Sequence, residues 1–133
     1  MAERREGVSV GRILFVDDDT DALETYVKAV SLANHTADVA SSAIDGWEML
    51  KKTKYDLIFV DLNIPEVSGF EFIEKLTKNK KTKSIPVVVI SALPEDDLVD
   101  DVLNAGAQLF LEKPVALADL FSVIEKYHSK SSK

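Results

Sequence analysis

Four apolar segments of the sequence each lead into residues that could do chemistry. These residues are Asp17, Asp18 and Asp19 after residues 13–16, Asp61 after 57–60, Ser91 after 87–90, and Lys113 shortly after 108–111. Taken singly, each has an ordinary structural explanation, because acids often cap a helix, Ser often begins a turn and Lys is common in loops. Their shared position after successive apolar segments makes the set informative.

Carboxylates crowded at one place favour a bound cation, because their ionised forms repel one another. Oxygen ligands select a hard ion, and a few carboxylates with room for water suit Mg²⁺ better than zinc or copper. A carboxylate can also attack phosphorus and form an aspartyl phosphate. A metal ion and a Lys ammonium would then neutralise the phosphoryl oxygens, and a hydroxyl such as that of Ser91 could hydrogen-bond the remaining oxygen.

Hydrophobic periodicity predicts the elements that position these residues. Apolar runs of strand length alternate with stretches of helical period along the whole chain. The expected strands cover residues 13–16, 36–40, 57–60, 87–90 and 108–111, and the apolar stripes of the expected helices cover 23–30, 43–52, 70–76, 98–103 and 117–124. Asp21 and Glu24 can form a capping box at the first helix, and Gly106 is expected to end the fourth, which opens at Pro94.

Five strand–helix pairs in strict alternation predict an α/β fold, a doubly wound parallel sheet with helices on both faces. The expected strands at 13–16, 57–60 and 87–90 are apolar without alternation and are therefore central, whereas 36–40 is more polar and fits an edge. This pattern predicts the strand order 2-1-3-4-5. Because neighbouring parallel strands end at the same edge of a sheet, the chemical residues should converge there.

Composition limits the classes of protein. The 133 residues carry 16 Lys and Arg against 23 Asp and Glu, a formal net charge of −7. The length fits one domain with an ordinary core, and a negative field opposes phosphate contacts, so we expect no direct nucleic-acid binding. No apolar run approaches the roughly 20 residues that span a bilayer, so we expect no membrane segment. Absence of cysteine excludes thiol chemistry and favours a cytoplasmic setting.

The sequence resembles the receiver domain of bacterial two-component response regulators, of the single-domain chemotaxis type. The resemblance covers residues 12–127 and rests on Asp17-Asp18, the run from Asp61 to Pro65 with Gly69, Ser91-Ala92 and Lys113-Pro114. We therefore expect residues 1–11 to be a flexible N-terminal extension, 12–128 to be the receiver domain and 129–133 to be a polar tail. No output domain follows, so the sequence fits either a stand-alone receiver or a segment of a longer regulator or hybrid kinase.

The resemblance implies that Asp61 accepts a phosphoryl group from a histidine kinase or a phosphotransfer protein. It implies that Asp17, Asp18, Asp61 and the backbone carbonyl of Asn63 hold Mg²⁺. Such a chain is a signalling phosphoacceptor and not an enzyme acting on a separate substrate. Its own His35 and His128 are isolated and carry no pattern of a phosphohistidine donor.

Further positions receive roles from the same resemblance. Ser91 and Lys113 would contact the phosphoryl group, Ala92 would keep the site accessible, and the Lys113–Pro114 bond is expected to be cis. Asn63 and Leu93 would tune the lifetime of the aspartyl phosphate, because Asn63 can orient a water molecule whereas Leu93 can exclude one.

The resemblance also implies a switch that a downstream protein reads. Ser91 would move toward the phosphoryl group and Phe110 would turn inward, although without the resemblance Phe110 would be taken for an ordinary core aromatic. The response would be read on the fourth helix, fifth strand and fifth helix. The fourth helix carries acids at 96, 97, 100 and 101, which fit either a solvated face or a docking surface for a basic partner.

Other classes of site fit the letters less well. An EF-hand loop starting at Asp17 would need Gly at Ala22 and Glu at Lys28, and a haloacid-dehalogenase-type phosphatase would need Thr or Val at Asp21. A flavodoxin would need a Ser/Thr/Gly phosphate loop where the chain has acids. A receiver-fold interaction module that works without phosphorylation remains the alternative. The oligomeric state stays open, and the Lys-rich run 77–84 is most simply a solvated loop opposite the active edge.

Overall fold

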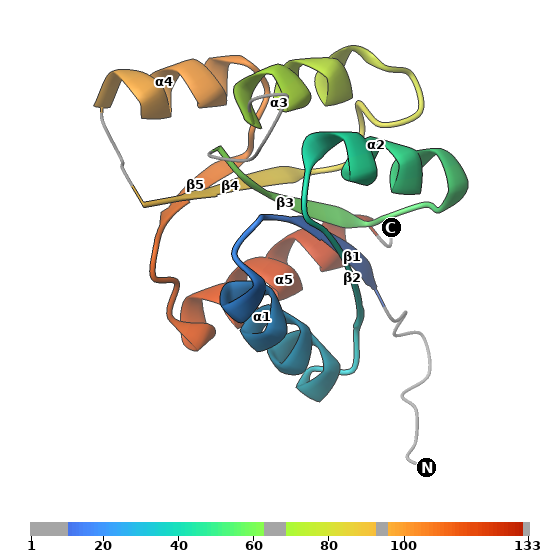
Figure 1. Cartoon of the computed structure of the whole chain (residues 1–133), viewed down its shortest axis with the longest axis vertical. Helices are drawn as coiled ribbons and strands as arrows, with labels where there is room; N and C mark the ends of the chain where they lie inside the picture. The colour runs from blue at the N-terminus through green and yellow to red at the C-terminus, as the bar shows by residue number, and fades with distance from the viewer. Residues whose placement is uncertain (1–10, 63–68, 93–95, 132–133) are drawn as a thin grey trace.

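The computed structural model of the protein describes residues 11–62, 69–92 and 96–131, the last few of these and 96–98 by their backbone alone. Strands and helices alternate throughout this part of the chain (Figure 1). The strands are β1 (Arg12–Val16), β2 (Thr36–Ala40), β3 (Leu57–Asp61), β4 (Val87–Ser91) and β5 (Leu109–Glu112). The helices are α1 (Thr20–Leu32), α2 (Ala43–Lys52), α3 (Gly69–Lys78), α4 (Asp96–Asn104) and α5 (Leu117–Ser131).

The five strands form one parallel sheet in the order β2-β1-β3-β4-β5, which confirms the predicted topology. Helices α1 and α5 cover one face of the sheet, and α2, α3 and α4 cover the other (Figure 1). Every residue of β3 and β4 is buried, as expected for central strands, whereas β2 at the edge buries only Ala40 fully. The sheet therefore separates two hydrophobic cores.

Alternate side chains of each strand enter opposite cores. Toward α2, α3 and α4 the strands contribute residues such as Val16 and Val60, which pack with Phe72. Toward α1 and α5 they contribute Phe15 and Phe59, whose rings stack at a centroid distance of 4.7 Å. Each fully buried side chain of this size stabilises the fold by about 1.5–3 kcal/mol. Two cores of this kind hold the carboxyl ends of the strands in fixed register.

The start of α1 differs from the predicted capping box. The helix begins at Thr20, so Asp19 is the N-cap residue, and its Oδ1 accepts a hydrogen bond from the Ala22 N–H at 3.1 Å. Asp21 is the second residue of the helix and therefore cannot be its N-cap. Its negative charge lies in the first turn. Asp19 therefore caps the helix, and the predicted capping box of Asp21 with Glu24 is wrong.

Other boundaries lie close to the expected ones. Strand β5 begins at Leu109 and not at Gln108, whose N–H donates to the Val87 carbonyl at 2.7 Å. Gly106, just past α4, has φ +123°, and a Cβ there would lie 2.3 Å from Thr77 Cγ2. The expected end of the helix is therefore a position that suits only glycine. Pro94 lies outside the described residues, and α5 continues to Ser131.

Gly11, at the start of the described chain, is buried and bonded on both sides. Its N–H donates to His35 Nδ1 at 3.0 Å, and its carbonyl accepts from Thr36 at 2.9 Å. None of the helices in the described ranges is both long and apolar enough to cross a bilayer.

Candidate functional site

The carboxyl ends of the central strands bring together three polar side chains that are distant in sequence. Asp17 follows β1 directly, Asp61 is the last residue of β3 and Ser91 is the last residue of β4. Their exposed fractions are only 3%, 6% and 6%. The β1–β3 register pairs Val16 with Val60, so Asp17 and Asp61 lie side by side at the end of neighbouring strands. The predicted convergence is therefore present for these residues.

Asp17, Asp18 and Asp61 form a cluster that fits a metal ion. Each offers a carboxylate oxygen, and the three oxygens lie within 4.8 Å of one another. Asp17 and Asp61 are buried, while Asp18 is exposed to solvent. An oxygen-only donor set with one side open to water matches the preference of Mg²⁺, which keeps several water ligands. Asn63, the fourth predicted ligand, lies outside the described residues.

Lys113 joins the two buried carboxylates. Its Nζ lies 2.9 Å from Asp17 Oδ2 and 3.1 Å from Asp61 Oδ2, and its side chain is only 17% exposed. The backbone delivers it there because the Lys113 N–H donates to the Ser91 carbonyl at 2.9 Å, which extends the β4–β5 pairing beyond the strand. The Lys113–Pro114 peptide bond is cis, as the resemblance implied. The ammonium thus bridges the two buried carboxylates of the cluster.

The electrostatics of the site reflect burial opposed by specific partners. Burial raises the pKa of Asp17, and the neighbouring Asp61 carboxylate adds to this, while the Asp19 N–H and the Lys113 ammonium oppose it. The Asp19 N–H donates to Asp17 Oδ1 at 2.9 Å. For Lys113, burial acts to lower the pKa, but hydrogen bonds to Asp17 and Asp61 outweigh it and raise the pKa above its ordinary value. A cation is therefore strongly favoured beside these carboxylates.

Gly69 lets α3 begin very close to the end of β3. A Cβ at this position would lie 2.5 Å from Leu62 Cα and 2.7 Å from the Asp61 carbonyl oxygen. The Gly69 N–H instead approaches the Leu62 carbonyl at 3.2 Å. Gly69 belongs to the motif that carries the resemblance, and the close backbone approach gives this position a structural role.

The remaining predicted residues lie around this cluster or outside the described chain. Ala92 and Pro114 are exposed at its rim. Phe110 is half-buried on β5, where it packs against the core under α2, α3 and α4. Leu93, like Asn63, lies outside the described residues. The sequence analysis missed the hydrogen bond from the Asp19 backbone to Asp17, because a backbone donor leaves no signal in residue type.

Comparison with known proteins identifies the family of this site. Residues 13–125 match the model of the response regulator receiver domain. The chain belongs to this family. Among curated relatives, the transcriptional regulatory protein PrrA of Mycobacterium leprae is 35% identical over 122 residues, covering 90% of this chain and 50% of PrrA. Response regulator RppA of Synechocystis is 31% identical, covering 90% of this chain and 51% of RppA. The receiver thus spans about half the length of these relatives.

Solved structures agree with the receiver fold. A CheY-like receiver domain protein from Methanospirillum hungatei superimposes with a TM-score of 0.86 at 26% identity, covering 92% of this chain and 97% of that chain. The receiver domain of the sensor histidine kinase PA1611 from Pseudomonas aeruginosa, which has a magnesium ion coordinated in its active-site cleft, gives a TM-score of 0.83 at 17% identity, with coverages of 91% and 99%. The second likeness concerns the fold alone.

Proposed function

We propose that this receiver accepts a phosphoryl group on Asp61 from the phosphohistidine of a sensor kinase or phosphotransfer protein, as a signalling phosphoacceptor in the cytoplasm and not as an enzyme with a separate substrate. The observation that carries the proposal is the Lys113 ammonium within 3.1 Å of both the Asp17 and the Asp61 carboxylates. Family membership and the acidic cluster support it.

In the proposed transfer, one Oδ of Asp61 attacks phosphorus. The new O–P bond forms as the P–N bond to the donor imidazole breaks, and the leaving nitrogen keeps the electron pair. Lys113 Nζ, already 3.1 Å from Asp61 Oδ2, would hydrogen-bond a phosphoryl oxygen and offset its charge. Ser91, buried at the end of β4, would donate its hydroxyl to another oxygen. These groups act mainly by positioning and by neutralising charge.

Magnesium fits the same site. Asp17, Asp18 and Asp61 would hold the ion, with the Asn63 carbonyl completing the protein ligands. When bound, Mg²⁺ supplies positive charge that stabilises the phosphoryl oxygens and offsets the repulsion between the carboxylates. The protein's own part is to fix the carboxylates on rigid strand ends, where Asp17 is also oriented by the Asp19 N–H.

The output of the proposed switch is the surface of α4, β5 and α5. Phe110 lies half-buried between β5 and the adjoining core, so an inward turn would change how β5 packs against α4. Asp100 and Asp101 are exposed on α4. Leu103 of α4 and Leu117 of α5 are also exposed, at 40% and 46%. A downstream protein would read this surface, and Ser91 would couple it to the phosphoryl group.

Labelling with acetyl phosphate and Mg²⁺ tests the proposal. Wild-type protein should gain one phosphoryl group, seen as a mass increase that is lost in Asp61→Asn and kept in Asp119→Asn, a control on the exposed surface of α5. Label retained in Asp61→Asn would refute Asp61 as the acceptor. No label on any variant, with Mg²⁺ present, would favour the phosphorylation-independent interaction module instead.

A further inference from the structure

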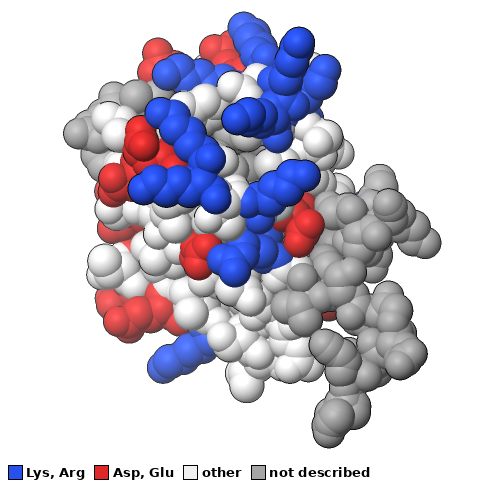
Figure 2. Space-filling model, turned by 90° about the vertical axis from the view of Figure 1, so that its right-hand side faces the viewer, with Lys and Arg blue, Asp and Glu red and all other residues white. Residues whose placement is uncertain are grey.

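Half of the positive charge of this acidic chain is concentrated at one place. Of the 16 Lys and Arg residues, eight lie in two short segments at and beyond the ends of α2 and α3. They are Lys51, Lys52, Lys54, Lys75, Lys78, Lys80, Lys81 and Lys83, and we call them the lysine surface. All eight are exposed. Figure 2 shows Lys and Arg side chains gathered on this face of the molecule.

The lysine surface lies near the amino ends of β3 and β4, whereas Asp61 lies at the carboxyl end of β3. Helices α2 and α3 end where β3 and β4 begin, whereas the acidic cluster lies where those strands end. The two segments meet in space, because a single groove is lined by residues 50–56 of one and by Lys80, Lys81 and Thr82 of the other. The surface is therefore separate from the phosphoryl site.

Helix ends and local ion pairs account for only part of this charge. Lysines in the last turns of α2 and α3 complement the helix dipoles, but Lys54, Lys80, Lys81 and Lys83 lie beyond both helices. Lys51 pairs with Glu48 at 3.1 Å. In the ranges that the structure describes, the other seven lysines make no ion pair within 4.0 Å. Direct ion pairs within the described ranges therefore leave these seven ammonium groups available to an anionic ligand.

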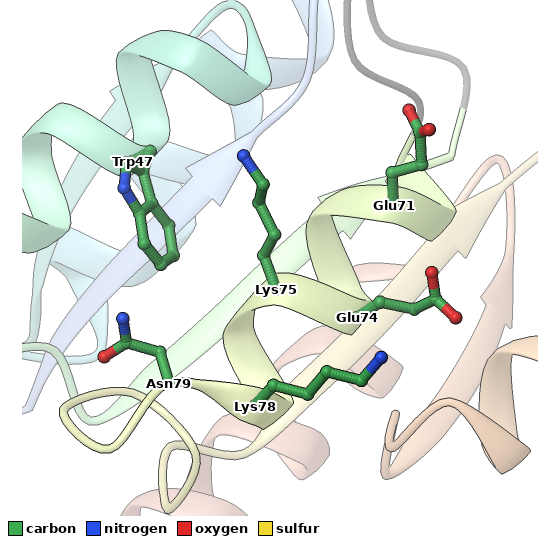
Figure 3. Close-up of a pocket in the computed structure, with 6 residues that line it drawn as sticks. All are labelled: Trp47, Glu71, Glu74, Lys75, Lys78 and Asn79. Carbon is green, nitrogen blue, oxygen red and sulfur yellow. The ribbon is translucent and has the colours of Figure 1, made fainter.

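The surface is hollowed and contains an aromatic anchor. Three adjoining depressions of about 600, 630 and 790 Å³ share lining residues, and Trp47 lines the first two. The indole of Trp47 is half-buried and packs edge-on against Phe72 at 6.4 Å, which holds it in place. Lys75 extends beside Trp47 between the two helices (Figure 3), and Glu71 and Glu74 also line the first depression. The depressions thus combine the apolar side chains of Trp47 and Leu50 with a rim that is mostly basic and includes Glu71, Glu74 and Asp56.

Asn79 adds a directed polar group. Its side-chain oxygen accepts a hydrogen bond from the Lys81 N–H at 2.8 Å. This leaves its amide nitrogen on the side of Trp47, where it can donate to a peptide carbonyl (Figure 3). An extended peptide with acidic residues and one apolar side chain matches this arrangement, because it can place carboxylates on the lysines and the apolar group on Trp47.

We propose that the lysine surface binds an extended acidic segment of a partner protein, with an apolar side chain of that segment seated on Trp47. The surface favours a peptide over a nucleic acid or a membrane. The depressions admit a single extended chain but not a flat bilayer. A peptide with apolar residues between its acids can place its carboxylates away from Glu48, Glu71 and Glu74, whereas a nucleic acid carries a charge on every phosphate and would meet these glutamates along its length. Binding here does not require phosphorylation of Asp61.

Tryptophan fluorescence provides a direct test, because Trp47 is the only tryptophan of the chain. A blocked synthetic peptide of alternating Glu and Leu should change the fluorescence in a saturable, salt-sensitive way. Its affinity should fall by about fivefold or more in the Lys81→Glu variant and stay unchanged in Lys28→Glu, a matched single charge reversal on exposed α1. Circular dichroism should show both variants folded.

Three results would overturn the proposal: absence of saturation with wild-type protein, an equal loss of affinity in Lys28→Glu, or tighter binding of oligothymidylate or of phosphatidylserine vesicles than of the peptide. The Asp61→Asn variant should bind the peptide as wild-type protein does. This separates the outcome from that of the proposed phosphoryl transfer, since either can fail alone.

Discussion

Lys113 Nζ lies 3.1 Å from Asp61 Oδ2, although the two residues are 52 positions apart in the sequence. The contact depends on β4, which lies between β3 and β5 and whose last carbonyl holds the Lys113 backbone. One cation thus already rests against the carboxylate that we propose as phosphoacceptor. In the proposed function the same ammonium would compete with Mg²⁺ for Asp17 and Asp61 and would hydrogen-bond the phosphoryl group after transfer.

Replacement of this ammonium should separate metal binding from phosphoryl transfer. In Lys113→Met the side chain keeps most of its length but loses its charge. The three carboxylates should then attract Mg²⁺ more strongly, and calorimetry should show a higher Mg²⁺ affinity. The rate of labelling by acetyl phosphate should fall by about 10²–10³, the usual cost of removing one donor to a developing oxyanion. A variant with weaker Mg²⁺ binding and an unchanged labelling rate would contradict this role.

Mg²⁺ should stabilise the folded chain through Asp17. Ligand at about a hundred times its Kd adds about 2.7 kcal/mol to the free energy of unfolding when it binds only the native state. Urea denaturation with and without Mg²⁺ should show an increment of this kind in wild-type protein and in Glu24→Gln, an exposed control on α1, but a much smaller one in Asp17→Asn. An equal increment in all three proteins would place the ion elsewhere.

The N-cap of α1 should be worth more than its first-turn acid. Asp19→Ala removes the acceptor of the 3.1 Å bond from Ala22 and should lower the free energy of unfolding by about 1 kcal/mol without Mg²⁺. Asp21→Ala removes only a favourable charge near the helix dipole and should cost about 0.3–1 kcal/mol, at the low end because the site is exposed. A larger loss of free energy of unfolding in Asp21→Ala than in Asp19→Ala would instead support the capping box.

Tyr55 should make stability sensitive to alkaline pH. Burial, together with the 2.6 Å hydrogen bond to Asp38 and the charge of that carboxylate, raises the pKa of Tyr55 from 10.0 to about 12. Because the folded state favours the protonated phenol, this contribution is complete below pH 10 and is lost as the pH rises through 12. Urea denaturation across this window should show the stability difference between wild-type protein and Tyr55→Phe shrinking; a constant difference would contradict the assignment.

Local pattern predicted much of the fold. The edge position of β2 followed from its polar residues, and the central positions of β3 and β4 followed from unbroken apolar runs that only burial on both faces explains. Period and side-chain polarity are properties of a few successive residues, so a sequence displays them directly. The start of α1 was harder, because Asp19 and Asp21 both suit a helix entrance and only the backbone conformation selects Asp19.

The sequence by itself determined which strands are central and the residue types at the strand ends, including Asp17, Asp61 and Lys113. Strand ends follow from hydrophobic boundaries, and unbroken apolar runs mark strands that are buried on both faces. Only the tertiary structure decided that Lys113 bridges the two carboxylates and that lysines from two separate segments form one grooved surface around Trp47. Those relationships depend on register and on the packing of α2 against α3. Such distances join residues far apart in the chain, and no local pattern encodes them.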